Sequence, residues 1–574
     1  MDKKEVADLL EEIAVLLEIT GDNPFKTRAY SGAARALLAL PGSLDDIVKE
    51  TGLKGVKGIG EGLRDRILEL HATGHLKYYD ELKASIPAGL TEMLRIPGLG
   101  PKKAKTIYDN LGIASIGELE YACHENRLIG LPGFGAKTQE KLLDGIAFQK
   151  RHSDLHLYPF AYAEAESLLI PILSHKKVTR AEVAGSVRRK KEVAKDIDIV
   201  AATSDPVSIM DMFTTLPGVE SVVSKGDTKS SVVLKSGINA DLRAVTDAEY
   251  PYALHHFTGS KLHNTAMRSR AKKMDMKMNE YGLFKGKDEM LVKCRDETEI
   301  FAALGLAFIP PELREDMGEI EAAEKGALPV LLKESDIQGV FHVHSRHSDG
   351  QDEVAELASA AIKLGYKYLG LTDHSPTAAY AGGLKEEELL RQQAEVDEAN
   401  RRFPGFHIFK GAEVDILPDG TLDYPENVLA GFDFTVCSIH SKFNMTEDEA
   451  TKRIVSAIEN PHCTIIGHPT GRLLLSRDGY PVNMRKVIEA AASHGVAIEL
   501  NAHPLRLDID WREMKYAKEL GVKIAINPDA HNLGGLKDVH YGVGIARKGW
   551  LEKSDVLNAM GLGEVTAYLK GGRR

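Results

Sequence analysis

The segment VAGSVRRKKEVAKDIDIVAAT (residues 183–203) decides how the centre of this chain folds. Asp196 and Asp198 alternate along an apolar run, so both carboxylates project from one face of the predicted strand. A third acid, Asp241, stands in another apolar strand segment, SGINADLRAV, which we expect to lie alongside. Three convergent carboxylates supply the oxygen ligands that a pair of Mg²⁺ ions requires.

A candidate anion site precedes these acids. Gly185 and Ser186 offer a backbone N–H and a hydroxyl at a turn, with Arg188 and Arg189 behind them. Hydrogen-bond donors and positive charge suit a triphosphate. An isolated D-x-D pair is usually surface alternation, but Gly-Ser, D-x-D and a later strand Asp form a more specific pattern.

The N-terminal part contains a repeat within short amphipathic helices. The copies are GVKGIGEGLRDRI (55–67), RIPGLGPKKAKTI (95–107) and GLPGFGAKTQEKL (130–142). Each Gly-x-Gly turn lets the backbone approach a phosphate and aims the N–H groups of the next helix at it. A single copy could equally be a turn between packed helices, whereas three copies with Lys102 and Lys137 in place favour phosphate binding.

From residue 336 onward, seven short apolar strand segments alternate with helical segments, which predicts a closed or nearly closed α/β barrel. Potential metal ligands follow these strands, at the barrel end where catalytic residues gather. Imidazole mixed with carboxylate suits Zn²⁺, Mn²⁺ or Fe²⁺ better than Mg²⁺, and nine donors imply two or three ions. The candidates are His342, His344, Asp349, His374, Glu413, His440, His468, Asp529 and His531.

Composition describes an ordinary globular protein of several domains. The 574 residues are 43% hydrophobic and 27% charged, and the four cysteines form no C-x-x-C pair. The net charge of −11 belongs to residues 301–574, with 30 basic and 41 acidic residues, because residues 1–300 hold 43 of each. This balance neither supports nor excludes a nucleic-acid partner. With no apolar run of membrane length and no signal-peptide pattern, we expect a cytoplasmic protein.

The Gly-Ser and aspartate pattern resembles the nucleotidyltransferase fold, and KGDTKSSVVL (225–234) with residues 255–284 resembles the palm and thumb of family X DNA polymerases. The repeats resemble helix–hairpin–helix modules, which bind the DNA backbone without reading sequence. The resemblance implies that Asp196, Asp198 and Asp241 hold Mg²⁺ or Mn²⁺, with Asp241 nearest the primer 3′-hydroxyl. It implies that Ser186 and Arg189 hold the incoming deoxynucleoside triphosphate.

The same resemblance assigns further contacts. Phe257, Gly259 and Asn264 would line the sugar and base of the nucleotide, and Arg268 would reach the template-side minor groove. DNA-backbone contacts would come from Gly58, Gly60, Gly98, Gly100, Lys102, Gly133, Gly135 and Lys26. Lyase members of the family use a lysine after the first hairpin, but Arg66 stands there, and a guanidinium cannot act as an amine nucleophile. We therefore expect no efficient 5′-deoxyribose-phosphate lyase activity.

The order of the nine barrel donors resembles the polymerase-and-histidinol-phosphatase (PHP) domain, a distorted seven-stranded barrel that hydrolyses phosphoesters. A family X polymerase followed by a PHP domain is the bacterial arrangement, so the resemblance spans nearly the whole chain. The expected domains are an N-terminal helical DNA-binding domain (1–85), a fingers-like hairpin region (86–150), a palm (151–250), a thumb (251–317), a linker (318–335) and the PHP domain (336–574).

The resemblance implies a monomeric, bacterial, nucleoid-associated DNA-repair enzyme. Gap-filling synthesis on gapped or nicked DNA would use the first site, and 3′→5′ exonuclease or apurinic endonuclease action would use two or three Mn²⁺, Zn²⁺ or Fe ions at the second. Two alternatives remain at this stage: a DNA-binding scaffold with inert modules, and a small-molecule phosphatase joined to a nucleotidyltransferase. The intact ligand sets oppose the first, and the three hairpin repeats oppose the second.

Overall fold

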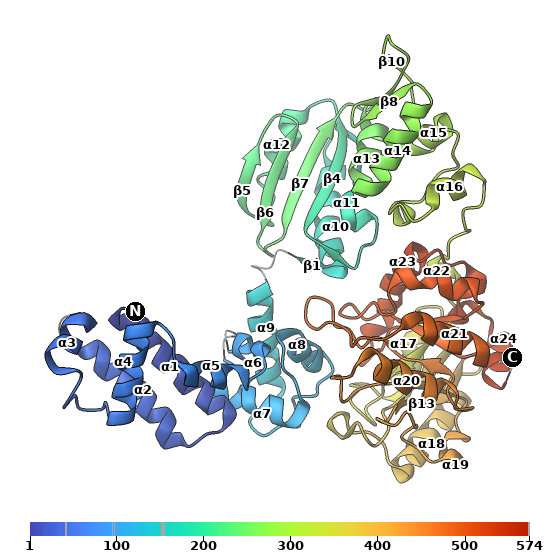
Figure 1. Ribbon diagram of the computed structural model, residues 1–574. Helices are drawn as coiled ribbons and strands as arrows, with labels where there is room; N and C mark the ends of the chain where they lie inside the picture. Colours follow the sequence, from blue (N-terminus) through green and yellow to red (C-terminus); the bar gives the residue numbers. More distant parts are fainter. Residues whose placement is uncertain (41–42, 95, 97, 151–154, 572–574) are drawn as a thin grey trace. The chain divides into compact units, whose positions relative to one another are not determined.

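The computed structural model describes residues 1–40, 43–94, 96, 98–150 and 155–571, and the chain forms two compact units, residues 1–149 and 150–574. The first unit is helical (Figure 1). Its helices are α1 (Lys3–Thr20), α2 (Pro24–Ala39), α3 (Leu44–Thr51), α4 (Glu61–Thr73), α5 (Lys77–Ala84), α6 (Ala88–Met93), α7 (Pro101–Leu111), α8 (Ile116–His124) and α9 (Ala136–Lys150). Two apolar clusters, one around α1, α2 and α4 and one around α7 and α8, hold these helices together.

The second unit begins with a five-stranded sheet in the order β2-β4-β7-β6-β5. Only the central β4 and β7 run parallel. The elements of this palm are β1 (His156–Leu157), α10 (Tyr158–Ser174), β2 (Val178–Val183), α11 (Gly185–Arg188), β3 (Val193–Ala194), β4 (Asp196–Thr203), α12 (Pro206–Phe213), β5 (Val219–Lys225), β6 (Lys229–Leu234) and β7 (Asn239–Val245).

The two faces of this sheet are covered differently. Residues such as Ile197 and Ile199 pack with α10 and α12 on one face. On the other face, Val200 and Ala202 pack against α13 (Tyr250–Thr258). Because side chains alternate along a strand, the carboxylates at the start of β4 lie on this second face.

The thumb follows the palm, and a further helix packs against its core. The thumb comprises α13, α14 (Lys261–Lys273), β8 (Met276–Asn279), β9 (Gly282–Lys285), β10 (Met290–Leu291), α15 (Glu297–Ala303) and the 3-10 turn η1 (Pro311–Leu313), and α16 (Glu319–Glu324) follows it. The segment predicted as a linker contains α16, whose Ile320 and Ala323 join the thumb core. Its Glu319 is fully buried and lies in hydrogen-bond contact with His263 at 2.7 Å, so this acid has a partner inside the thumb core.

The remainder of the second unit is a seven-stranded parallel barrel in the order β11 to β17, which confirms the predicted (β/α)₇ fold. A parallel bridge from Val343 to Ala530 brings the first and last strands together. The strands are β11 (Gly339–Val343), β12 (Tyr368–Leu371), β13 (His407–Asp415), β14 (Phe434–Ser438), β15 (Ile465–Ile466), β16 (Ala497–Asn501) and β17 (Ile524–Asn527).

Helices surround this barrel (Figure 1). They are α17 (Val354–Lys363), α18 (Glu386–Arg402), α19 (Glu426–Leu429), α20 (Glu447–Ile458), α21 (Met484–His494), α22 (Trp511–Glu519), α23 (Val539–Lys548) and α24 (Leu562–Leu569), with 3-10 turns η2 (Glu334–Asp336), η3 (Ala379–Ala381), η4 (Gly535–Asp538), η5 (Lys553–Asp555) and η6 (Leu557–Ala559). Among the helices of the described residues, none combines the length and hydropathy that crossing a bilayer requires.

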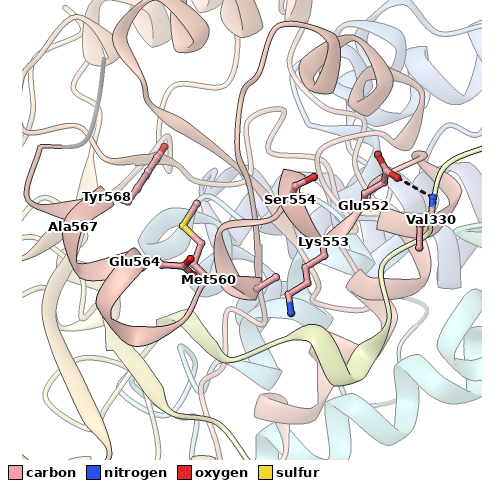
Figure 2. A pocket seen from close by; sticks show the side chains of 9 residues that line it. Val330, Glu552, Lys553, Ser554, Met560, Glu564, Ala567 and Tyr568 are labelled. Carbon is pink, nitrogen blue, oxygen red and sulfur yellow. Dashed lines mark hydrogen bonds between the residues drawn. The ribbon is translucent and has the colours of Figure 1, made fainter.

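The two ends of the barrel differ in chemistry. Phe341, Phe409 and Phe434 fill the interior, and polar side chains gather beyond them at the carboxyl ends of the strands. The amino-terminal end is closed by η6, whose Asn558 donates to the Gly339 carbonyl at 3.1 Å. A surface pocket of about 740 Å³ lies near this closed end, lined by residues including Glu552, Met560 and Tyr568 (Figure 2). This pocket lies at the end of the barrel opposite to the predicted metal ligands.

Candidate metal centres in the palm and the barrel

Register brings the three palm aspartates to one place. Asp198 on β4 lies directly opposite Asp241 on β7, and Asp196 lies two residues earlier on the same face. Asp198 packs against Gly185, the first residue of α11, so closely that a Cβ there would stand 2.2 Å from its Oδ2. Gly185 has a φ of +61°, so the sequence needs glycine there for both space and backbone conformation.

The palm carboxylates repel one another. Burial and the charges of Asp196 and Asp241 raise the pKa of Asp198 to about 7. Lys229 on β6, which the sequence did not single out, places its Nζ 2.7 Å from Oδ2 of Asp241. Arg243, two residues after Asp241, lies over the Phe257 ring at 4.4 Å. Divalent cations would relieve the remaining repulsion, so the donor set fits the Mg²⁺ or Mn²⁺ ions expected here.

The predicted nucleotide contacts surround this face. Ser186 lies on α11, and Arg189 follows it, buried, with its Nη1 donating to the Thr258 carbonyl at 2.8 Å. Gly259 ends α13 where a Cβ would meet Asn264 Oδ1 at 2.3 Å, and Asn264 Nδ2 donates to the His256 carbonyl at 2.7 Å. The structure thus brings Gly259 and Asn264 into contact with each other.

Two further predicted contacts lie nearby on the same helices. Phe257 stands near the end of α13, under Arg243, and Arg268 is exposed on α14.

The hairpin repeats share one backbone geometry. Gly58, Gly98 and Gly133 have φ between +84° and +95°, the region that glycine adopts freely. Gly60 and Gly100 then cap α4 and α7 without any side-chain cap, and Gly135 precedes α9, which leaves helix N–H groups for a phosphate. Lys102 and Lys137 are exposed, whereas Lys26 is half-buried and pairs with Asp22 at 2.8 Å. Arg95 and Pro97 of the second copy lie outside the described residues.

The nine predicted barrel ligands converge. Their donor atoms fall into overlapping groups in which all atoms lie within 4.8 Å of one another. These groups are His344, Asp349, His374 and His531; His342, Glu413 and His468; His342, His344 and Asp529; and His374, Glu413 and His440. Three of these residues, His342, His468 and Asp529, have positive φ, a backbone strain of the kind that concentrates at functional sites.

The spacing of these donors matches a coordination shell. Glu413 is central, with its oxygens 3.0 Å from His374 Nδ1, 3.1 Å from His440 Nε2 and 3.3 Å from His342 Nε2. Two ligands each about 2.1 Å from one ion, at a tetrahedral angle, stand about 3.4 Å apart. The ring nitrogens of His344 and His374 are buried and make no hydrogen bond within the described residues. Buried donors of this kind are satisfied by metal ions, so the set fits the two or three ions expected.

A carboxylate that sequence reasoning missed supports these ligands. Glu499 on β16 accepts from His342 Nδ1 at 2.5 Å and from the His468 N–H at 2.6 Å, and it is fully buried. Its bond to Nδ1 leaves the Nε2 of His342 directed at the other donors. Glu499 stands on the one barrel strand to which no ligand was assigned, which is the signal that could have found it.

Other histidines that flank the motifs take other roles. His347 pairs with Glu395 at 3.1 Å, and the His503 Nδ1 accepts from the Leu505 N–H at 3.2 Å. Asp415 orients His440, because its Oδ1 lies 3.2 Å from His440 Nδ1, as Glu499 orients His342.

Replacing Glu499 by glutamine should weaken barrel activity about 10- to 100-fold, the usual effect of losing a carboxylate that orients a metal-binding histidine. Glutamine keeps the volume but removes the charge that holds His342. Palm activity should not change, and Glu489→Gln on the exposed face of α21 is the matched control. Equal activity of the variant and the wild type in a 3′-end shortening assay would contradict this role.

Metal removal should lower the stability of the barrel. A metal at about 100 times its dissociation constant stabilises a fold by about 2.7 kcal/mol, which shifts the melting temperature of a domain of this size by about 5–10 °C. Thermal unfolding in EDTA and in excess Mn²⁺ measures the shift. Glu413→Gln should lose most of it, and identical melting of the wild type in both conditions would contradict the metal assignment.

The fold and the donor sets define a chain that joins a nucleotidyltransferase palm and helix–hairpin–helix modules to a PHP-type metal barrel. Family models agree with this class. The DNA polymerase beta thumb matches residues 253–315, the PHP domain 341–503, a helix-hairpin-helix domain 1–76 and a SAM-like helix-hairpin-helix tandem 90–147.

Whole-chain similarity identifies the family. The DNA polymerase/3′-5′ exonuclease PolX of Bacillus subtilis (strain 168) is 40% identical over 572 residues, which cover 99% of this chain and 100% of that protein. A probable phosphatase of Thermoanaerobacter sp. (strain X514) is 32% identical over 244 residues, 41% of this chain and 94% of its own. A probable phosphatase of Acetivibrio thermocellus is 31% identical over 199 residues, 33% of this chain and 78% of its own. The chain belongs to the PolX family, which confirms the resemblance stated above.

Proposed function

We propose that this protein is a DNA-directed DNA polymerase with a 3′→5′ exonuclease in the same chain, and that it serves DNA repair by filling gaps. The observation that carries the proposal is the coexistence of two different donor sets. One consists of carboxylates beside the Gly185–Ser186 turn. The other is a nine-residue shell rich in histidine.

In the palm, Asp196, Asp198 and Asp241 would hold Mg²⁺ or Mn²⁺. When bound, these ions supply charge stabilisation for the attacking and leaving oxygens of an in-line displacement. Asp241 would stand nearest the primer 3′-hydroxyl and would assist its deprotonation. Ser186 and Arg189 hold the triphosphate, and Phe257, Gly259 and Asn264 line the sugar and base, while Arg268 reaches the template strand.

In the barrel, the nine donors would hold two or three Mn²⁺, Zn²⁺ or Fe ions, which supply Lewis-acid activation for phosphoester hydrolysis. Glu499 and Asp415 fix the orientation of His342 and His440. The scissile bond is the phosphodiester at a DNA 3′ end, and the same chemistry serves apurinic sites and blocked 3′ termini. The hairpin glycines and Lys102 bind the DNA backbone without sequence preference. Gapped or nicked DNA is the proposed substrate, and the protein acts on it as a monomer.

A second function is favoured by the probable phosphatases that match the barrel, namely hydrolysis of a small phosphate monoester. Assays with Mn²⁺ distinguish the two functions. Histidinol phosphate and a 3′-recessed duplex are offered separately and then in competition with each other. We expect shortening of the duplex and no phosphate release from histidinol phosphate. Release of phosphate without shortening would assign the barrel to small molecules.

We expect no efficient 5′-deoxyribose-phosphate lyase activity. Arg66, on α4 after the first hairpin, stacks over the Tyr78 ring at 3.9 Å and carries no amine nucleophile. Borohydride added to the protein with an incised abasic duplex should trap no covalent adduct. The matched comparison is Arg66→Lys, which places an amine at this position. A trapped adduct on the wild-type chain would refute the assignment.

A further inference from the structure

Helix α23 of the barrel ends against the palm turn that carries Arg189. Lys548, the last residue of α23, is fully buried, and its Nζ donates to the Arg189 carbonyl at 3.2 Å. The approach is close, because a Cβ at Gly544, one turn earlier, would stand 2.8 Å from Cδ of Lys190. The barrel therefore touches the segment between the triphosphate turn and the strand of catalytic aspartates.

Three buried charges meet at this contact. Oε1 of Glu315 accepts from Lys548 Nζ at 2.5 Å and from Arg189 Nε at 2.9 Å. The side chains of Arg189 and Glu315 are only 10% and 12% exposed. Nη1 of Arg189 donates to the Thr258 carbonyl at 2.8 Å. Within the described residues, Nη2 is the guanidinium nitrogen that makes no hydrogen bond, so it remains for a ligand.

The net charge of this triad determines how much positive charge a ligand at Arg189 experiences. Lys548 and Arg189 are positive and Glu315 is negative, so the triad carries one net positive charge. Without the ammonium group, Glu315 would neutralise Arg189 alone and the net charge would be zero. Buried charges are weakly screened, so this difference reaches the neighbouring site. Arg189 is close enough to the palm aspartates for its charge to act on the pKa of Asp198, in the lowering direction, against the dominant effect of burial.

We propose that Lys548 of the barrel is a positioning residue for nucleotide binding in the palm. By balancing Glu315, it keeps Arg189 both fixed and effectively positive toward the triphosphate, so the affinity of the polymerase site for nucleotide depends on the PHP barrel. This inference rests on the proposed function of the palm, and it assigns to the barrel a role in synthesis that is independent of its own metal site.

The interface does not depend on Lys548 alone. Arg547 Nε donates to Glu312 at 2.7 Å, and Tyr541 packs edge-on against Tyr158 of the palm with ring centroids 6.1 Å apart. Loss of the Lys548 ammonium group should therefore change the charge of the triad while the two parts stay docked.

Lys548→Met tests the proposal on the full-length protein. Burial lowers the pKa of Lys548 to about 8, so assays at pH 7 keep the wild-type side chain protonated. We expect the KM for the nucleotide in single-gap filling to rise about tenfold or more, the effect of losing a charged hydrogen-bond partner, with kcat changed less than about twofold. Shortening of 3′ ends should remain at the wild-type rate. Lys518→Met, which breaks a barrel ion pair with Glu552 at 2.7 Å, is the matched control and should change neither.

A second substitution separates charge from packing. Adding Glu315→Gln to Lys548→Met restores one net positive charge and keeps an oxygen for Arg189 Nε, so the KM should return to within about twofold of the wild type. A structural role would instead make the double variant worse than the single one. If Lys548→Met melts at a lower temperature than the wild type, Lys548→Gln replaces it.

The outcomes distinguish the polymerase function of the palm from the role of Lys548. A wild-type protein that extends no primer refutes the proposed polymerase function. A wild-type protein that extends, together with an unchanged KM in Lys548→Met or no recovery in the double variant, refutes the role of Lys548 and leaves the polymerase function intact.

Discussion

We expect Asp241→Ala to abolish primer extension and to leave 3′-end shortening at the wild-type rate. Asp241 is expected to bind the ion beside the primer 3′-hydroxyl and faces Asp198 across the parallel strand pair. Losing this ligand removes several kcal/mol of transition-state stabilisation, so extension should fall by at least about 1000-fold. Extension of a 5′-labelled primer across a one-nucleotide gap measures the effect.

The control for this variant is Asp211→Ala, an exposed acid on α12 of the same palm that pairs with Lys225 at 2.6 Å. It should extend primers normally. Loss of shortening as well as extension in Asp241→Ala, in a protein that melts like the wild type, would mean that the two activities share one site.

We expect the opposite result for Glu413→Gln. Its oxygens lie within 3.6 Å of nitrogens from His342, His344, His374, His440 and His468, so it is the common carboxylate of the barrel shell. Replacing it with a neutral amide should remove one or more ions and lower shortening by at least about 1000-fold. Extension should remain within about twofold of the wild type.

The control is Glu426→Gln, the same substitution at an exposed glutamate that starts α19 and lies outside the set of metal ligands. Shortening that survives in Glu413→Gln at more than about a tenth of the wild-type rate would place the nuclease elsewhere. A loss of both activities in the folded variant would contradict separate sites.

Sequence alone predicted what depends on local pattern. The seven apolar segments predicted the seven barrel strands, and the residues that follow them predicted the nine converging donors, because the ends of parallel strands in a barrel meet at one rim. The alternation of Asp196 and Asp198 likewise predicted a shared face. The register of β4 against β7, which pairs Asp198 with Asp241, comes from the structure, because two neighbouring strands can pair in more than one register.

The sequence could not predict contacts that depend on three-dimensional neighbours. Lys229 reaches Asp241 from the adjacent strand β6, and Glu499 reaches His342 across the barrel from a residue 157 positions away. Neither has a local signature that separates it from an ordinary strand residue. The triad of Arg189, Glu315 and Lys548 spans the palm, the thumb and the last third of the chain.

The segment 318–335 was predicted as a linker because it is acidic and lacks a clear pattern. The two apolar residues Ile320 and Ala323 are too few to show helical periodicity in the sequence. In the structure these two residues complete the thumb core, and Glu319 is buried against His263. A charge run is therefore a weak guide where a buried histidine can pair with it.

The central claim is that one chain builds DNA at the palm and removes it at the barrel. The most direct measurement uses the purified protein with Mn²⁺ and a one-nucleotide-gapped duplex labelled at the primer 5′ end, incubated with and without nucleotides. We expect extension by one nucleotide in their presence and stepwise shortening from the 3′ end in their absence. Folded, metal-loaded protein that leaves the primer unchanged in both reactions would contradict the account.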